Sequence, residues 1–159
     1  MTEDEKTLKL LIRDDGTGME EDFLKRVTDP FCTTRTTRKV GMGIPLLKME
    51  AEMTGGTFRI DSVSEKKDPE HHGTETEALF YKDHIDFIPL GDVRSSVVTL
   101  IQGHPDTDFL FRHVMPEGTV ELDTRELRAV LGDEVPLNEY EVIKWIEDSL
   151  KEQYEDLHS

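Results

Sequence analysis

The sequence predicts an α+β fold from the kinds of element it encodes and from their order along the chain. Residues 7–13 alternate apolar and polar side chains as a strand does, and residues 57–63 and 75–81 are predicted to pair as a hairpin. Residues 44–53 and 92–102 instead space their apolar side chains as helices do. Strands and helices therefore share this chain of 159 residues.

The first half opens with the strand over 7–13, in which Leu8, Leu10 and Ile12 fall on one face. An Asp-Asp-Gly-Thr-Gly turn ends it. Glycine and proline mark the boundaries of the elements that follow. These elements are a short helix over 20–27, a loop over 31–42, a helix over 44–53, and the hairpin of 57–63 with 75–81.

The character of the sequence changes at residues 83–91, so we expect two parts, 1–82 and 83–159. Helix and turn signals define the second part as an α/β extension. It contains a helix over 92–102, a hairpin of 109–114 with 119–122, a helix after Asp123 with a capping box to Glu126, and a last helix from an Asn138 cap to about Leu157.

The charge of the chain excludes several classes of partner. A net charge of −16 would repel a phosphate backbone, so we expect no nucleic acid and no anionic membrane as partner. One cysteine, Cys32, permits neither an internal disulfide nor a multi-cysteine zinc site. With no apolar signal region and no long apolar run, a cytoplasmic location is expected.

Two segments of the first part carry groups suited to a purine nucleotide. Asp14 follows a strand and can accept a hydrogen bond from an exocyclic amine, while Gly16 and Gly18 let the backbone approach a base closely. The Asp-Pro-Phe-Cys-Thr-Thr-Arg segment from Asp29 and the basic residues after it offer hydroxyls and guanidinium groups to phosphates. Taken alone, the first is an ordinary turn and the second a solvated basic loop.

Two further segments complete the pattern. Glycines at 41 and 43 stand directly before a helix, whose free amides and dipole favour an anion. This box lacks the Gly-Lys-Ser/Thr of a Walker loop and the third glycine of a dinucleotide fingerprint, and alone it is a hinge before a core helix. The fourth segment, Gly73-Thr74, is uninformative by itself.

In this order the four segments resemble the GHKL superfamily, which includes sensor histidine kinases, gyrase, ninety-kilodalton heat-shock chaperones and mismatch-repair ATPases. The D-x-G-x-G-M, D-P-F-x-T-T, G-x-G-I-P-L-L-K and G-T boxes match the histidine-kinase branch best. The resemblance implies a two-layer α/β sandwich, a mixed sheet with helices on one face. Residues 83–159 are similar to the C-terminal part of small stand-alone ATP-binding proteins of this type.

The resemblance also implies a role for each motif residue. Asp14 would bind the adenine amine with support from Thr74, and Gly16 and Gly18 would admit the base. Phe31 would begin a lid over the nucleotide. The phosphates would meet the hydroxyls, cations and glycines of the next two boxes, namely Thr33, Thr34, Arg35, Arg38, Lys39, Gly41 and Gly43.

One part of the family site has no match. Relatives hold magnesium through an asparagine on an upstream E-x-x-x-N helix, whereas the only asparagine here, Asn138, is at the predicted cap. We therefore expect no catalytic residue, ATP or ADP as ligand, and Mg²⁺ only through the nucleotide. All six histidines are expected in loops or at the surface, and His71-His72 has no third ligand nearby that would make it a metal site.

Two functions fit these residues. The first is an adenine-nucleotide-binding module of histidine-kinase type, regulatory, with any phosphotransfer directed to a separate, unidentified protein. The second is a non-catalytic interaction module with a vestigial pocket.

The helix over 44–53 has two apolar stripes. Ile44, Leu47 and Ala51 form the first, and the second, Leu46, Met49 and Met53, needs its own cover. A neighbouring helix or a second copy of the chain, forming a homodimer, would provide it.

Overall fold

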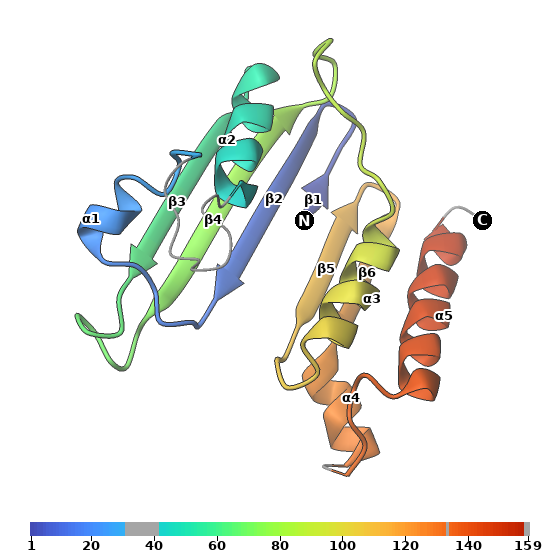
Figure 1. The fold of residues 1–159 in the computed structure, drawn as a ribbon. Coiled ribbons are helices and arrows are strands. Elements are labelled where there is room, and N and C mark those ends of the chain that lie inside the picture. The colour runs from blue at the N-terminus through green and yellow to red at the C-terminus, as the bar shows by residue number, and fades with distance from the viewer. Residues whose placement is uncertain (31–41, 133, 158–159) are drawn as a thin grey trace. The chain divides into compact units, whose positions relative to one another are not determined.

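A computed structural model describes residues 1–30, 42–132 and 134–157, in two units, Met1–Ile88 and Pro89–Ser159 (Figure 1). Both strands and helices occur in each unit, which confirms the α+β class. The elements of the first unit are β1 (Thr2–Glu3), β2 (Thr7–Asp14), α1 (Glu21–Leu24), α2 (Gly43–Met53), β3 (Thr57–Val63) and β4 (Gly73–Tyr81).

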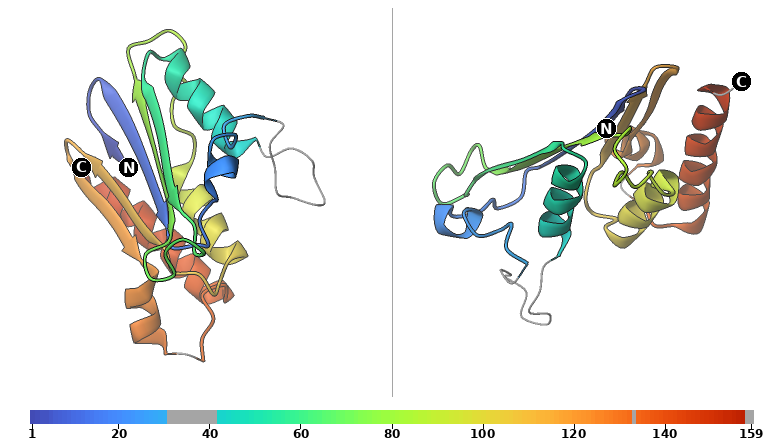
Figure 2. Two further views of the ribbon diagram at one scale, coloured as in Figure 1. Left: turned by 90° about the vertical axis from the view of Figure 1, so that its left-hand side faces the viewer. Right: turned by 90° about the horizontal axis from the view of Figure 1, so that it is seen from above.

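The strands of the first unit lie in the order β3-β4-β2-β1, and each neighbouring pair is antiparallel. The predicted hairpin of β3 with β4 is confirmed, although β4 begins at Gly73, two residues before its predicted start. The short β1 was not predicted. Helix α2 packs against β3 and β4, on one side of the sheet (Figure 2).

The two faces of this sheet differ in chemistry because neighbouring side chains point to opposite sides. Residues in register across β2, β4 and β3 share a face, and one such row joins Leu10, Ala78 and Phe58. Ala78 is fully buried there. The other face carries ion pairs, from Lys9 to Glu77 and from Arg13 and Arg59 to Glu75.

Helix α2 divides into the two apolar stripes predicted from its periodicity. Ala51, from the first stripe, is completely buried against the sheet. The second stripe stays largely open, with Leu46 40%, Met49 45% and Met53 45% exposed. What covers the second stripe therefore stays a prediction. After the helix, Gly55 adopts a φ of 76°, a conformation that favours glycine.

Helix α1 is shorter than the predicted span of 20–27. It occupies only Glu21–Leu24 and has no side-chain cap. Beyond it the backbone makes tight i→i+3 turns, in which the Arg26 amide donates to Phe23 and the Asp29 amide to Arg26. Nucleation is costly for so short a segment, and without a cap the helix ends after one turn.

The second unit, residues 89–159, has its own core. It comprises α3 (Val93–Gly103), β5 (Leu110–Met115), β6 (Gly118–Asp123), α4 (Thr124–Leu131) and α5 (Tyr140–Leu157), with β5 and β6 forming the predicted hairpin. The buried hydrophobic side chains of this core come from α3, β6, α5 and the segment before α5. They are Val97, Ile101, Val120, Leu122, Leu137, Val142, Ile146 and Leu150.

Three expectations for the second unit need correction. His113 is not at the surface: it is 4% exposed, and its Nδ1 lies 2.8 Å from the Tyr154 hydroxyl. Helix α5 begins at Tyr140, one residue later than a cap at Asn138 implies. Asp123 does cap α4, but it accepts from the amide of Arg125 rather than from that of Glu126.

Candidate functional site

A polar row crosses three strands at one end of the apolar face of the first unit. Thr74 in β4 is in register with Asp14 in β2 and with Ser62 in β3, so all three side chains lie on the same face. The preceding row on this face contains Ile12, which is 49% exposed even though its neighbour Thr76 is buried. The polar row thus borders a half-exposed apolar side chain of the sheet.

Ser62 is the centre of the hydrogen bonds in this row. Its hydroxyl donates to the Gly73 carbonyl at 3.0 Å and accepts from the Met19 amide at 2.8 Å. It also lies 2.9 Å from the Thr74 hydroxyl. One side chain therefore ties the turn after β2 to the start of β4.

Glycine is required where this turn, residues 14–19, meets β3. Gly18 has a φ of 65°, and a Cβ there would lie 1.9 Å from the Val63 carbonyl oxygen. The chain is held at this point by a bond from the Glu65 amide to the Thr17 carbonyl, 2.8 Å long. Gly18 thus serves close backbone packing within the protein, a role that the sequence motif alone did not reveal.

One of the two carboxylate oxygens of Asp14 accepts a hydrogen bond within its own turn. Its Oδ1 accepts from the Gly16 amide at 2.9 Å. Its Oδ2 has no partner among the described residues, so it can accept a hydrogen bond from a ligand. On the far side of the turn, His72 Nδ1 lies 2.6 Å from the Gly16 carbonyl.

The connection between β3 and β4 is ordered by its own polar contacts. Asp68 accepts from the amides of His71 and Glu70, at 3.0 and 3.1 Å, and these bonds lower the pKa of its carboxyl. They shape the chain just before His72.

In the described part of the chain, no three His, Cys, Asp or Glu side chains are grouped to hold a metal ion.

The start of α2 presents backbone donors that have no partner within the helix, and no side chain of the described residues caps them. Gly43 is its first residue, the helix has no side-chain cap, and nothing would lie within 4 Å of a Cβ on Gly43. Because Pro45 has no N–H, Gly43 and Ile44 supply the free amides of the first turn. Such amides, with the helix dipole, can bind an anion.

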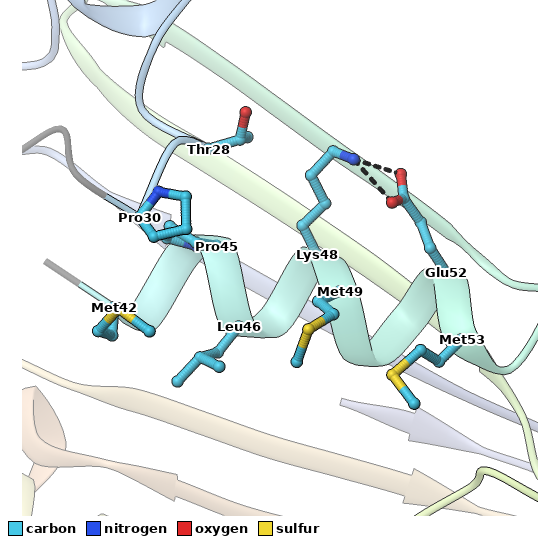
Figure 3. A pocket seen from close by; sticks show the side chains of 9 residues that line it. All are labelled: Thr28, Pro30, Met42, Pro45, Leu46, Lys48, Met49, Glu52 and Met53. Carbon is cyan, nitrogen blue, oxygen red and sulfur yellow. Dashed lines mark hydrogen bonds and ion pairs between the residues drawn. The ribbon is translucent and has the colours of Figure 1, made fainter.

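A separate groove of about 530 Å³ runs along the open stripe of α2 (Figure 3). Thr28 and Pro30 form its other side, and the Lys48–Glu52 ion pair borders it with an N–O distance of 2.6 Å. Neither Asp14 nor Thr74 lines it. The groove is mainly apolar, whereas the acceptors of Asp14 and Thr74 belong to the polar row.

The structure brings together four of the predicted site residues, Asp14, Gly16, Gly18 and Thr74, and it exposes Gly43 at the start of α2. Seven others lie outside the described residues: Phe31, Thr33, Thr34, Arg35, Arg38, Lys39 and Gly41. Sequence reasoning missed Ser62 and the contact of His72. The alternation of Phe58, Ile60 and Ser62 on one strand face was the signal that could have identified Ser62.

Comparison with known proteins defines the class. Residues 1–83 match the family of histidine kinase-, DNA gyrase B- and HSP90-like ATPases, and the chain belongs to this family. The resemblance to the GHKL superfamily is thereby confirmed.

A curated relative is named as a sporulation kinase. The chain is 33% identical over 66 residues to sporulation kinase A of Bacillus subtilis (strain 168), an alignment that covers 42% of this chain. The matched part spans 11% of the relative's length.

In the described part of the chain, no helix has the length and apolar character needed to cross a membrane.

Proposed function

We propose that the first unit binds an adenine nucleotide, ATP or ADP, through the polar row of Asp14, Thr74 and Ser62. The observation that carries this proposal is the Oδ2 of Asp14, which has no partner among the described residues and stands in register with Thr74 beside the half-exposed side chain of Ile12. A carboxylate oxygen is the acceptor that an exocyclic amine needs, and an apolar surface suits the ring. The family match to ATPases supports the same ligand.

The phosphates would be bound at the other end of the nucleotide by backbone amides and cations. The uncapped first turn of α2 at Gly43 supports this assignment. Gly41 and the basic residues Arg35, Arg38 and Lys39, which lie outside the described residues, would supply the remaining contacts. Mg²⁺ would then bind through the nucleotide alone, because the sequence offers no asparagine in this unit.

The biological role that fits best is regulatory. We expect the chain to act in signalling, in the cytoplasm, with any phosphotransfer directed to a separate protein. Binding of nucleic acid or an anionic membrane is disfavoured by the net charge of −16. As sequence kinship extends over only 11% of sporulation kinase A, the activity of that whole protein is not carried over.

A second function is favoured by a different observation. The open stripe of α2, with its groove, is an apolar surface of the kind that contacts another protein. In this alternative the chain is a non-catalytic interaction module with a vestigial nucleotide pocket. It predicts partner binding that does not change with nucleotide.

Replacing Asp14 by alanine tests the main proposal. Loss of the charged acceptor should weaken ADP and ATP binding by about 1.5–3 kcal/mol, or about 10- to 150-fold. Asp15→Ala is the matched control, since the neighbouring Asp15 is exposed and has no assigned contact with the base. Calorimetric titration measures both. Equal binding of adenine and guanine nucleotides by the unaltered chain would reject the proposal.

A further inference from the structure

We propose that Ser62 determines the base specificity of the site, by forcing the Thr74 hydroxyl to present only an acceptor to the ligand. The inference rests on the nucleotide-binding function proposed above. It concerns a residue outside the sequence motifs and follows from counting the protons in the polar row.

The hydrogen bonds of Ser62 have a fixed direction. A serine hydroxyl has one proton, and a carbonyl oxygen only accepts, so the 3.0 Å bond to Gly73 uses the Ser62 proton. The Met19 amide donates to the same oxygen at 2.8 Å. For the 2.9 Å contact between the two hydroxyls, the proton must then come from Thr74.

The carbonyl that sets this direction is itself held in place. Gly73 has a φ of 136°, and a Cβ at this position would lie 2.1 Å from the Asp14 carbonyl oxygen. In addition, Ser62 and Gly73 belong to paired strands, in which Val63 is in register with Gly73. Ser62 therefore has a constant acceptor for its proton, and Thr74 a constant acceptor for its own.

The consequence is that a C6 substituent bound between Thr74 and Asp14 meets acceptors from both side chains. With its proton given to Ser62, Thr74 offers lone pairs, and the free Oδ2 of Asp14 offers the same. An amino group at C6 of a purine can donate to such a site. A 6-oxo purine would place a carbonyl oxygen against these acceptors, and no proton would lie between them.

The test compares ADP with inosine diphosphate, which has an oxygen in place of the 6-amino group, by calorimetry in the absence of metal. The unaltered chain should prefer ADP by about 10- to 150-fold. In Ser62→Ala the Thr74 proton is released and can turn toward the ligand, so this preference should fall about five- to tenfold. Ser62→Thr keeps the hydroxyl and should restore the preference.

Threonine 74 supplies the decisive control. In a Thr74→Val background, Ser62→Ala should leave the ratio of the two affinities unchanged within about twofold, because the rotating hydroxyl is gone. Thr74→Val alone should weaken ADP but not inosine diphosphate. This single variant also decides the question if Ser62→Ala does not fold: equal weakening of both ligands would show that Thr74 donates, and would overturn the inference.

The outcomes separate the inference from the function on which it rests. If the unaltered chain binds neither diphosphate, both fail. If it prefers ADP and Ser62→Ala weakens both ligands by the same factor, nucleotide binding stands and the specificity role of Ser62 is wrong.

Discussion

Replacing Gly18 by alanine should destabilise the first unit by an amount that the structure predicts. The residue has a φ of 65°, and an L-residue in this conformation costs about 1–2 kcal/mol. In addition, the new Cβ would lie 1.9 Å from the Val63 carbonyl oxygen, so β3 or the turn must move. Relief of such an overlap costs about 1–3 kcal/mol, which makes a total of about 2–5 kcal/mol.

Gly55 provides a matched control. Its φ of 76° is similar, yet nothing would lie within 4 Å of a Cβ on it. Gly55→Ala should therefore show the conformational cost alone, about 1–2 kcal/mol. The difference between the two variants isolates the contact between Gly18 and the Val63 backbone.

Urea unfolding followed by far-ultraviolet circular dichroism measures both variants. Trp145, the single tryptophan, lies in α5 of the second unit, so its fluorescence reports on that unit. Gly18→Ala should also weaken ADP binding, because the turn carries Asp14. Equal destabilisation by the two substitutions would refute the packing argument.

Three further predictions concern the metal, the open helix face and pH. ATP should bind about as well in EDTA as in magnesium, measured by calorimetry, because no asparagine of this unit can couple the metal to the protein. A phosphate-release assay should detect no turnover of ATP. Magnesium-dependent tight binding would show that another ligand replaces the asparagine. Met49→Glu should lower stability or dissociate a dimer, since the open stripe is expected to be covered; a strict monomer by light scattering, with unchanged stability, argues against any cover. Hydrogen bonds from the backbone and side chain of Ser95 lower the pKa of Asp92. The stability that this cap of α3 contributes is therefore present above the ordinary carboxyl pKa and is lost as the pH falls below about 4, through the lowered value. Asp92→Ser keeps a cap without a carboxylate, so it should reduce this loss of stability at low pH, followed by Trp145 fluorescence. An unchanged loss of stability would assign it to other groups.

Much of the fold could be predicted because its strands and helices have clear periodicity. The alternation of Leu8, Leu10 and Ile12 gave β2, and the two stripes of α2 followed from helical spacing. The sequence predicted the wrong length for α1, because a segment that short has too little helix propensity to fix where the helix ends. His113 is buried against the expectation of a loop or surface position, and Phe111 and Met115 on the same strand face were the signal for its burial.

The site was predicted less completely, for a physical reason. Motifs identify residues such as Asp14 that follow one another in fixed spacing. Ser62 enters the site only through strand register, which brings it beside Thr74 although 12 residues separate them in sequence. Gly18 was identified by its motif but given a role toward the ligand, whereas the structure shows that it first serves contact with Val63.

The polar row also sets where the sequence of this unit can change in length. Inserting one residue into β2 before Asp14 would turn every following side chain to the opposite face and bring Arg13 to the place of the row. An insertion in β4 after Thr74 would likewise bring Glu75 to the buried place of Thr76. Insertions between Ser64 and His72 fall outside the paired strands and leave this register intact. Natural variants of the unit should therefore differ in length in the β3–β4 connection and keep the strand lengths before and after it constant.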